Sequence, residues 1–272
     1  MKILIVGAGG IGGFFGAKLF QVGADITFLL REKRQKLIQE QGLTIETPKG
    51  NMTIQPHTIL ASQLEPVYDL IILACKAFDL NDALQSITKA SSKGFILPFL
   101  NGFTHLKTLD HHFSKGRVMG GVAHIAATIT ETGSIKQLNP LNSLTIGPRS
   151  PEQELLSQEF FTMCQKADFD SFYKKNIEQA LWDKWVFLAT LAGMTTICRG
   201  SIGEILAIKY GKALIEQMFS ECCSIASGNG YVITESAQAT ALEILTKQGS
   251  AFTASMLRDL LAGKRDEHEH IL

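Results

Sequence analysis

A short apolar segment followed at once by three regularly spaced glycines opens the chain. Residues 2–6 are rich in β-branched side chains, which is typical of a buried parallel strand. Three glycines follow with the spacing G-x-G-x-x-G, namely Gly7, Gly9 and Gly12. Residues 10–20 then have the apolar periodicity of a helix, and residues 25–30 form a second apolar segment. This order predicts a β-α-β unit and therefore an α/β domain.

Each glycine of the pattern has a mechanical role. Gly7 permits the tight turn from strand to helix, Gly9 lets a pyrophosphate approach the backbone, and Gly12 lets the helix pack closely on the strand. The N-terminus of the helix offers free N–H groups and the positive end of its dipole to phosphates. We therefore predict a dinucleotide-binding loop made by consecutive residues: Gly7, Ala8, Gly9, Gly10, Ile11 and Gly12. The alternative is a glycine-rich turn that binds no ligand.

The residue at the end of the second strand distinguishes the two nicotinamide cofactors. An NAD-binding unit usually carries Asp or Glu about 20 residues after the glycines, where it bonds the ribose hydroxyl. Here Arg31 follows the strand, and its planar guanidinium can pair with a 2′-phosphate. This favours NADP(H), whereas Glu32 is the residue that would suit NAD. Alternatively, Arg31, Lys33 and Arg34 are only the solvated start of the next helix.

The pattern of apolar segments divides the chain into two parts. Up to about residue 150 strands alternate with helices, including a hairpin at 43–56 and strands at 118–130 and 143–147 joined through glycine-rich and Asn-Pro turns. Helices dominate afterwards. The length of 272 residues suits two modest domains. We predict a Rossmann-type α/β domain with a mostly parallel sheet over residues 1–165, followed by an all-α domain over residues 166–272.

Composition excludes several classes of partner. Basic and acidic residues are balanced at 26 each, so nothing indicates a nucleic-acid partner. No apolar run approaches the ~20 residues that span a bilayer, and no leader precedes the first strand. The five cysteines form neither a C-x-x-C redox pair nor a zinc knuckle, and no histidines have the helical spacing of metal ligands. We expect a cytoplasmic protein with no membrane association and no metal.

Polar residues at the ends of two further strands are candidate ligand contacts. Lys76 follows the apolar segment at 68–75, and Asn101 follows the one at 95–100. Ligands of open parallel sheets bind outside the carboxyl ends of the strands. Lys76 is therefore a candidate contact of the cofactor, and Asn101 of the nicotinamide or the substrate. The alternatives are a surface lysine and a simple turn.

Lys184 is the most unusual charge in the second half of the chain. The helix predicted over residues 177–194 is apolar nearly all round, and such helices are buried. A lysine there extends to solvent, pairs with an acid or takes part in catalysis. The neighbouring Asp183 does not share its face of the helix. The alternative is a lysine at the margin of a core helix.

Taken together, these residues resemble the ketopantoate reductase family (2-dehydropantoate 2-reductases) over essentially the whole chain. The motifs that carry the resemblance are, besides the glycines and Arg31, Cys75-Lys76-Ala77, Asn101-Gly102, Gly120-Gly121-Val122-Ala123, Trp182-x-Lys184, Ser255-Met256-x-x-Asp259 and the acidic segment at Glu267. The resemblance implies a Rossmann domain and a helical domain like that of 6-phosphogluconate dehydrogenase, with the active site between them. It also implies reduction of ketopantoate to pantoate by NADPH, a step towards pantothenate and coenzyme A.

The resemblance further implies a role for each candidate residue. Arg31 and Lys76 would lie near the 2′-phosphate, and Asn101 would position the substrate and the nicotinamide. Lys184 would be the general acid that polarises the substrate ketone. The substrate ligands would be Ser255, which binds the carboxylate, and Glu267, which binds the substrate hydroxyl or the lysine. We also expect the helical domain to bind the small 2-oxo acid and to support a homodimer.

Two features depart from the family pattern. The family often carries asparagines one and two turns after the lysine, where this chain has Leu188 and Ala192. Either nearby polar residues replace them (Thr195, Thr196 or Arg199), or the substrate is a different 2-oxo acid. The chain also stops at Leu272, where family members usually continue, which predicts a truncated C-terminus. A non-catalytic NADP(H)-binding redox sensor is the remaining alternative.

Overall fold

The computed structural model describes residues 1–272 and divides into two compact units. Unit 1 comprises residues 1–100 and 105–177, and unit 2 comprises residues 101–104 and 178–272. All strands belong to unit 1, whereas unit 2 is helical. The predicted fold class, an α/β domain followed by an all-α domain, is confirmed.

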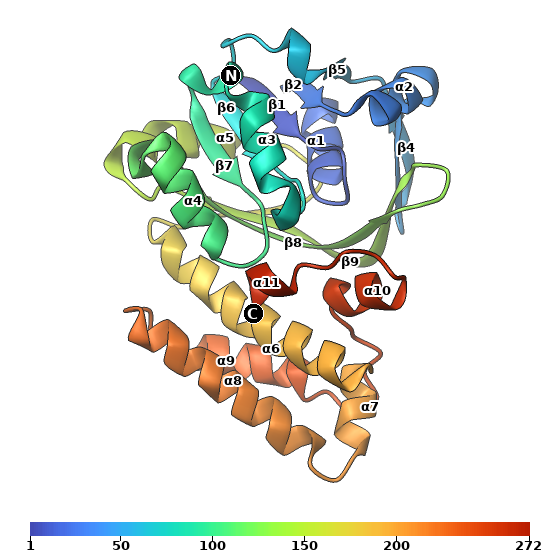
Figure 1. Cartoon of the computed structure of the whole chain (residues 1–272), viewed down its shortest axis with the longest axis vertical. Helices are drawn as coiled ribbons and strands as arrows, with labels where there is room; N and C mark the ends of the chain where they lie inside the picture. Colours follow the sequence, from blue (N-terminus) through green and yellow to red (C-terminus); the bar gives the residue numbers. More distant parts are fainter. The chain divides into compact units, whose positions relative to one another are not determined.

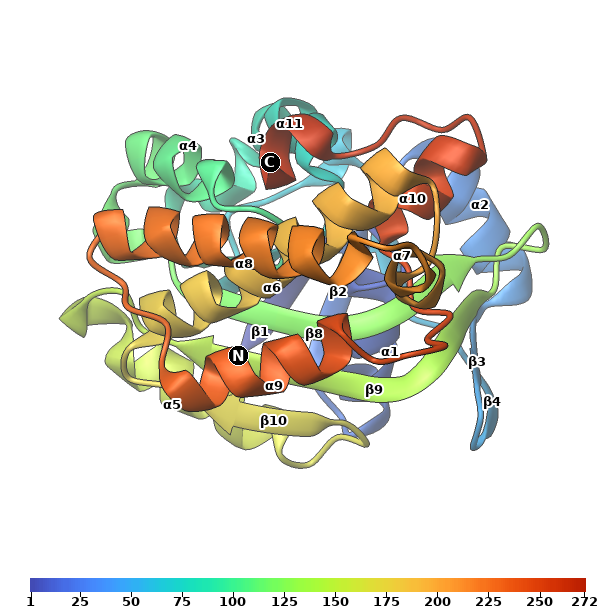
Figure 2. The same cartoon turned by 90° about the horizontal axis from the view of Figure 1, so that it is seen from below.

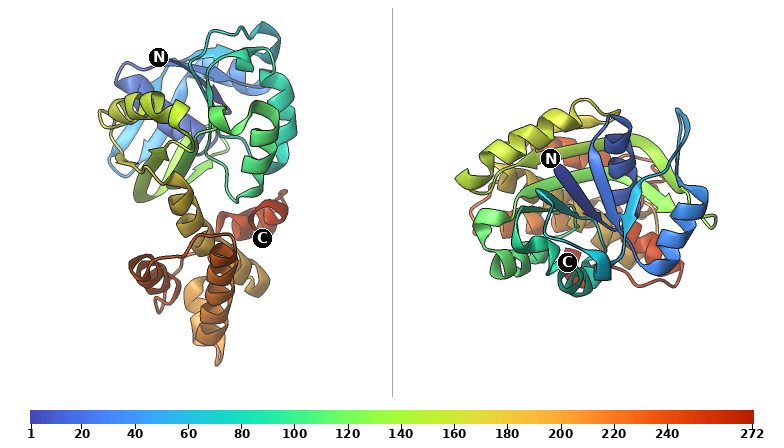
Figure 3. Two further views of the ribbon diagram at one scale, coloured as in Figure 1. Left: turned by 90° about the vertical axis from the view of Figure 1, so that its left-hand side faces the viewer. Right: turned by 90° about the horizontal axis from the view of Figure 1, so that it is seen from above.

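Unit 1 is built on a parallel sheet of five strands in the order β5-β2-β1-β6-β7. Its strands are β1 (Lys2–Val6), β2 (Asp25–Leu29), β5 (His57–Ile59), β6 (Leu70–Leu73) and β7 (Phe95–Pro98). β1 and β6 are almost entirely buried, which explains why their sequences are continuous apolar runs. The helices that lie around this sheet (Figures 1 and 3) are α1 (Gly12–Gln21), α2 (Glu32–Gln41), α3 (Leu80–Ile87) and α4 (Thr104–Phe113).

A second sheet of unit 1 has the order β10-β9-β3-β4, with β8 paired to β9. Its strands are β3 (Leu43–Thr47), β4 (Gly50–Ile54), β8 (Gly120–Ile129), β9 (Ile135–Gly147) and β10 (Asp170–Tyr173), and α5 (Glu154–Cys164) precedes β10. β3 and β4 form the predicted antiparallel hairpin. β8 and β9 form a second, much longer hairpin, which is visible as two curved green strands in Figure 2.

Pro140 lies inside β9, so the predicted Asn-Pro turn is wrong. The ladder between β8 and β9 pairs Ile125 with Asn142 and then Ala127 with Gln137, with a register shift between these pairs. Proline has no N–H to donate to a ladder and is tolerated where a bulge interrupts the pairing. The strand therefore continues past the proline.

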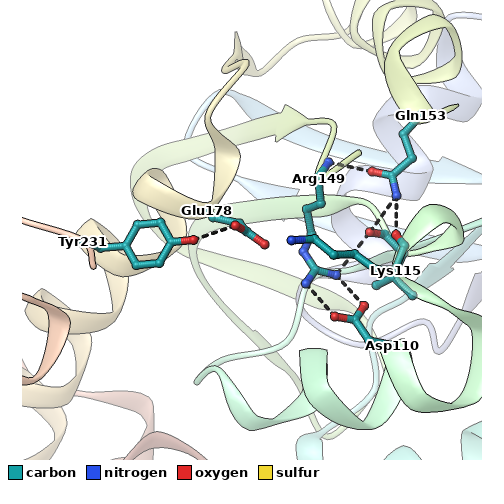
Figure 4. Close-up of polar contacts among 7 residues, drawn as sticks. Asp110, Lys115, Arg149, Gln153, Glu178 and Tyr231 are labelled. Atoms are coloured by element: carbon teal, nitrogen blue, oxygen red, sulfur yellow. Dashed lines mark hydrogen bonds and ion pairs between the residues drawn. The ribbon is translucent and has the colours of Figure 1, made fainter. Parts of the chain in front are cut away.

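A partly buried ion pair stabilises unit 1 (Figure 4). Arg149 binds Asp110 of α4 through both guanidinium nitrogens, at 2.6 Å and 2.7 Å. The Arg149 N–H donates to Gln153 Oε1 at 2.6 Å, and Gln153 Nε2 donates to the Lys115 carbonyl at 2.7 Å. Because the pair is bidentate and the amide of Gln153 is satisfied on both sides, this network fixes the start of α5 against the end of α4.

Unit 2 packs around one long helix. Its helices are α6 (Ile177–Cys198), α7 (Ile202–Ala207), α8 (Gly211–Gly228), α9 (Glu235–Leu245), α10 (Ser255–Leu261) and α11 (His268–Ile271). α6 runs beside α8 (Figures 1 and 2), and Val186 and Ala189 of α6 join Ile215 and Phe219 of α8 in the buried core. None of the helices has both the length and the apolar character that crossing a bilayer would require.

Unit 1 extends beyond the expected boundary between residues 165 and 166. β10 pairs in parallel with β9, so the segment after α5 is part of the second sheet. The helical unit begins at Glu178, one residue into α6, and it also takes in residues 101–104.

Candidate active site

The glycine loop joins β1 to α1, and its three glycines are needed for different reasons. Gly7 has a φ of +97°, a conformation that favours glycine. A Cβ on Gly12 would overlap the Gly7 carbonyl oxygen, so Gly12 permits the close approach of helix and strand. A Cβ on Gly9 would meet no atom within 4 Å. Packing within the chain therefore does not explain Gly9, and the space above its backbone is open.

The N-terminus of α1 fits an anionic group. Its N-cap residue is Ile11, no side chain caps the helix, and no acidic residue lies in its first turn. The first N–H groups of a helix have no partner within the helix, and they carry the positive end of the dipole. The residues present at the loop thus suit the pyrophosphate of a dinucleotide, with room at Gly9 and no competing carboxylate.

Arg31 and Lys76 lie at the same edge of the parallel sheet. Arg31 is the N-cap residue of α2, and its side chain is largely exposed. Its Nη2 lies 3.1 Å from Oδ1 of Asp79. Asp79 belongs to the short turn Ala77–Asp79, whose N-cap residue is Lys76. The two candidate phosphate ligands therefore follow β2 and β6, the strands on either side of β1.

Arg34 is not a solvated residue at the start of α2, which corrects the alternative considered from sequence. It is half-buried, and its guanidinium donates to the carbonyls of Ala8 at 3.2 Å and Gly133 at 2.7 Å. Burial lowers the pKa of Arg34 from its usual value. Gly133 is 99 residues away in sequence, so no local pattern could have revealed the contact.

In unit 2, two of the predicted site residues, Asn101 and Glu267, lie beside a third, Lys184. The Lys184 Nζ donates to Oδ1 of Asn101 at 3.1 Å. Burial lowers the Lys184 pKa from 10.5 to about 8, and the negative charge of Glu267 opposes that shift. Although part of the lysine side chain remains accessible, protein surrounds its amine densely enough to remove much of its hydration. Glu267, the N-cap residue of α11, is itself buried, with 4% of the residue exposed.

Two contacts hold α11 in place within unit 2. Gly102 has a φ of +81°, and a Cβ there would overlap the carbonyl oxygen of His270. Trp185 Nε1 donates to the Ile271 carbonyl at 3.0 Å. Since Gly102 follows Asn101 directly, the close approach of this turn to α11 sets the position of Asn101 relative to Glu267.

Ser255 follows a residue that contacts a later turn of α6 than the one that carries Lys184. It opens α10, and the preceding Ala254 N–H donates to the hydroxyl of Thr195 at 3.4 Å. Thr195 comes about three helical turns after Lys184. Ser255 itself is half-buried. The structure therefore brings Lys184, Asn101 and Glu267 together, and it places Ser255 at the start of α10, directly after the residue that bonds Thr195.

The two residues that replace the family's asparagines, Leu188 and Ala192, also have apolar surroundings. Ala192 is fully buried, and Leu188 packs against the core of unit 2. Of the proposed replacements, Thr195 is already used, because its hydroxyl also donates to the Leu191 carbonyl at 2.7 Å. The hydroxyl of Thr196 is buried and makes no hydrogen bond, whereas Arg199 is exposed at the end of α6.

Comparison with known proteins gives the family of the chain. Residues 3–151 match the family model described as ketopantoate reductase PanE/ApbA, and residues 176–272 match the model of the ketopantoate reductase PanE/ApbA C-terminal domain. The chain is 30% identical over 272 residues to YkpB of Bacillus subtilis (strain 168), an uncharacterized oxidoreductase, with 100% of this chain and 89% of YkpB covered.

Solved structures share the whole fold. The 2-dehydropantoate 2-reductase of Geobacter metallireducens GS-15 is similar with a TM-score of 0.90 at 25% identity, covering 100% of this chain and 90% of that chain. D-mandelate dehydrogenase, in a ternary structure with NADH and anilino(oxo)acetate, has a TM-score of 0.87 at 21% identity and coverages of 100% and 89%. A dimeric ketopantoate reductase from Staphylococcus aureus has a TM-score of 0.80 at 21% identity and coverages of 100% and 88%.

The last two likenesses are likenesses of fold, whereas the family models and YkpB extend to sequence over both units. The resemblance noted from the glycine loop, Lys184 and Asn101-Gly102 is therefore confirmed. The chain belongs to the ketopantoate reductase PanE/ApbA family, whose members are oxidoreductases that act on CH–OH groups.

Proposed function

We propose that this protein reduces ketopantoate to pantoate with NADPH, in the biosynthesis of pantothenate and coenzyme A. The observation that carries the proposal is the contact of the Lys184 amine with Asn101, beside the buried carboxylate of Glu267. Family membership and the likeness to the Geobacter 2-dehydropantoate 2-reductase support it. The glycine loop, with room at Gly9 and no acid at the N-terminus of α1, supports a dinucleotide cofactor.

Lys184 is the general acid of the proposed reaction. The bound cofactor supplies the hydride that reduces the ketone carbon. Negative charge then develops on the ketone oxygen, and a cation that can give up a proton stabilises it. Asn101 holds the lysine amine by accepting its hydrogen bond. Glu267 keeps the amine protonated by opposing the effect of burial on its pKa.

The pH dependence of turnover follows from this role. The acid is active only while Lys184 is protonated, so kcat/KM should be level below the Lys184 pKa of about 8 and fall as pH rises through it. Glu267→Gln removes the charge that raises this pKa, so the fall should begin at lower pH. Asp183→Asn is the matched control, because Asp183 lies beside Lys184 in sequence but accepts from Gln179 at 2.9 Å. A profile that is unchanged in Glu267→Gln would contradict the coupling.

Preference for NADPH is the finer part of the cofactor proposal, and Arg31 and Lys76 carry it. Arg31→Asp should weaken NADPH binding on the order of 100-fold and NADH binding little, because a charged hydrogen bond contributes about 1.5–3 kcal/mol and the new acid repels the 2′-phosphate. Titration of NADPH and NADH fluorescence measures both affinities. Lys33→Asp, on the exposed side of the same helix, makes the same charge change and should alter neither much. Equal losses for both cofactors in Arg31→Asp would refute the role of Arg31.

A different 2-oxo acid is the second candidate substrate. Leu188 offers no hydrogen bond where the family often has an asparagine, and Ala192, at the second such position, is fully buried, so a site beside the partly buried Leu188 suits an apolar side chain. The likeness of fold to D-mandelate dehydrogenase is in keeping with an aromatic 2-oxo acid. This candidate keeps every role assigned to Lys184, Asn101 and Glu267 and changes only the group beyond the carboxylate.

Oxidation of NADPH on addition of a 2-oxo acid tests the proposal. We expect turnover of ketopantoate well above that of 2-oxoisovalerate, which lacks its hydroxyl group, and of phenylglyoxylate. Higher turnover of either of these would favour the second candidate. Tight NADPH binding with no turnover of any of the three would favour a redox sensor.

A homodimer is the proposed assembly, and the dimeric Staphylococcus aureus enzyme with the same fold supports it. Light scattering coupled to gel filtration measures the mass directly against the 29.8 kDa of one chain.

A further inference from the structure

Arg34 links the glycine loop to a distant hairpin of unit 1. Its Nη1 donates to the carbonyl of Gly133, in the turn between β8 and β9, at 2.7 Å. Its Nη2 donates to the carbonyl of Ala8, inside the glycine loop, at 3.2 Å. The planar guanidinium can serve two carbonyls at once in a fixed geometry, which a lysine cannot do. One side chain thus joins two backbone segments that are far apart in sequence.

The bond to Ala8 fixes the orientation of the next amide. In a trans peptide the carbonyl and the N–H point in opposite directions. Because the Ala8 carbonyl points at Arg34, the N–H of Gly9 in the same peptide points away from Arg34. That N–H donates to no backbone carbonyl. Among the glycines of the loop, Gly9 is the one where an added Cβ would meet no atom within 4 Å.

The hairpin supports the loop at further points. A Cβ on Gly10 would lie 3.0 Å from the carbonyl oxygen of Ala127 in β8, and one on Gly13 would overlap Ile135 in β9. Gly133 itself has a φ of +88°, and a Cβ there would lie 2.9 Å from Nη1 of Arg34. The turn therefore needs glycine both for its backbone conformation and for the close approach of the guanidinium.

We propose that Arg34 is the positioning residue of the dinucleotide site, which holds the Ala8–Gly9 peptide with its N–H turned towards the cofactor pyrophosphate. This inference rests on the proposed function. Arg34 also places a positive charge within hydrogen-bond distance of the loop that would receive two phosphates. The β8–β9 hairpin anchors this arginine, so a strand pair outside the parallel sheet takes part in shaping the cofactor site.

The role predicts a pattern of affinities that differs from that of Arg31. The pyrophosphate is common to both cofactors, so Arg34→Ala should weaken NADPH and NADH by the same factor, about tenfold, as expected for the loss of one charge-assisted contact. At saturating cofactor kcat should stay close to the wild-type value, because the catalytic lysine belongs to unit 2 and is unaltered. The effect should therefore appear in KM for the cofactor.

Arg117→Ala is the matched control. Arg117 also binds backbone carbonyls, with Nε donating to Gly94 at 3.0 Å and Nη2 to Ser91 at 2.6 Å, and burial lowers its pKa as it does for Arg34. Its loss should lower the melting temperature and leave both cofactor affinities unchanged. If Arg34→Ala does not fold, Arg34→Lys gives the second test, because a lysine keeps the positive charge but cannot bond the two carbonyls at once in the fixed geometry of a guanidinium.

Hydrogen exchange of the free protein separates this inference from the proposed function. Arg34→Ala should speed exchange in residues 7–13, whereas Arg117→Ala should not. Unchanged exchange and unchanged affinities would overturn the positioning role, and a loss confined to NADPH would make Arg34 a ligand of the 2′-phosphate instead. If the wild-type protein binds neither cofactor, the proposed function fails, and the exchange rates alone then decide whether Arg34 positions the loop.

Discussion

Replacement of Lys184 by Ala should reduce kcat/KM for the 2-oxo acid on the order of 10³-fold, as is typical when a general acid is lost. The amine, which is bonded to Asn101, can both stabilise charge on the ketone oxygen and release a proton. Lys184→Arg should be nearly as inactive, because a guanidinium keeps its charge but does not release its proton at working pH. Initial rates of NADPH oxidation, taken at the same cofactor saturation, give kcat/KM for the wild type, Lys184→Ala and Lys184→Arg.

The stability of the variant separates this effect from misfolding. Lys184→Met, which is similar in size and apolar, removes a buried amine but leaves the buried Glu267 without its positive neighbour, so the variant should fold with a somewhat lower melting temperature at pH 7. Lys212→Met is the matched control, since Lys212 is exposed on α8 and pairs only with Glu216 at 3.6 Å. A folded Lys184→Met protein with near wild-type turnover would remove Lys184 from the mechanism.

Gly102→Ala should lower kcat on the order of 10²-fold without any change in the charged groups. The new Cβ would overlap the carbonyl oxygen of His270, so either the turn that carries Asn101 or the segment that carries Glu267 has to move. Displacements of about 1 Å in catalytic groups cost about this factor. Steady-state kinetics measure the fall in kcat. The pH profile of kcat/KM shows whether Glu267 has moved away from Lys184, because a larger separation lowers the Lys184 pKa.

Gly249→Ala isolates the cause. Gly249 also has a positive φ, +67°, and lies in unit 2, but a Cβ there would meet nothing within 4 Å. It should therefore lose about 1 kcal/mol of stability from backbone strain and keep full activity. If both glycine variants lose activity equally, strain rather than the contact with His270 is responsible.

Local sequence patterns were sufficient for the fold class and for part of the site. The apolar runs of β1 and β6 and the glycines between β1 and α1 are signals that a few neighbouring residues carry, and they predict a parallel sheet with a loop at its carboxyl edge. Lys184 was recognisable because a charge stood in a helix that is apolar on nearly every side. The resemblance to a family added Ser255 and Glu267, whose surroundings have no local signal.

The remaining features depend on contacts between distant segments. Arg34 looked like a surface residue of α2, because the carbonyl that it binds belongs to a turn 99 residues away. Pro140 indicated a turn, but the pairing of β9 with β8, β3 and β10 outweighs its local preference. β10 has the sequence Asp-Ser-Phe-Tyr, in which polar and apolar residues do not alternate, so the strand is recognisable only through its parallel pairing with β9.

The segment at residues 101–104 prevents the helical unit from folding as one continuous stretch of chain. It belongs to the helical unit although its neighbours in sequence, on both sides, belong to unit 1, so the chain crosses between the units at three points rather than one. A fragment that starts at residue 178 would lack Asn101 and also Phe103, whose ring stacks on Trp182 at a centroid distance of 4.4 Å. During synthesis this segment emerges long before α6, so its contacts with Lys184 and Trp182 can form only after α6 has been made. The helical unit therefore depends on several contacts of very long range, those of Asn101, Gly102 and Phe103 with Lys184, His270 and Trp182, and contacts of that kind slow folding.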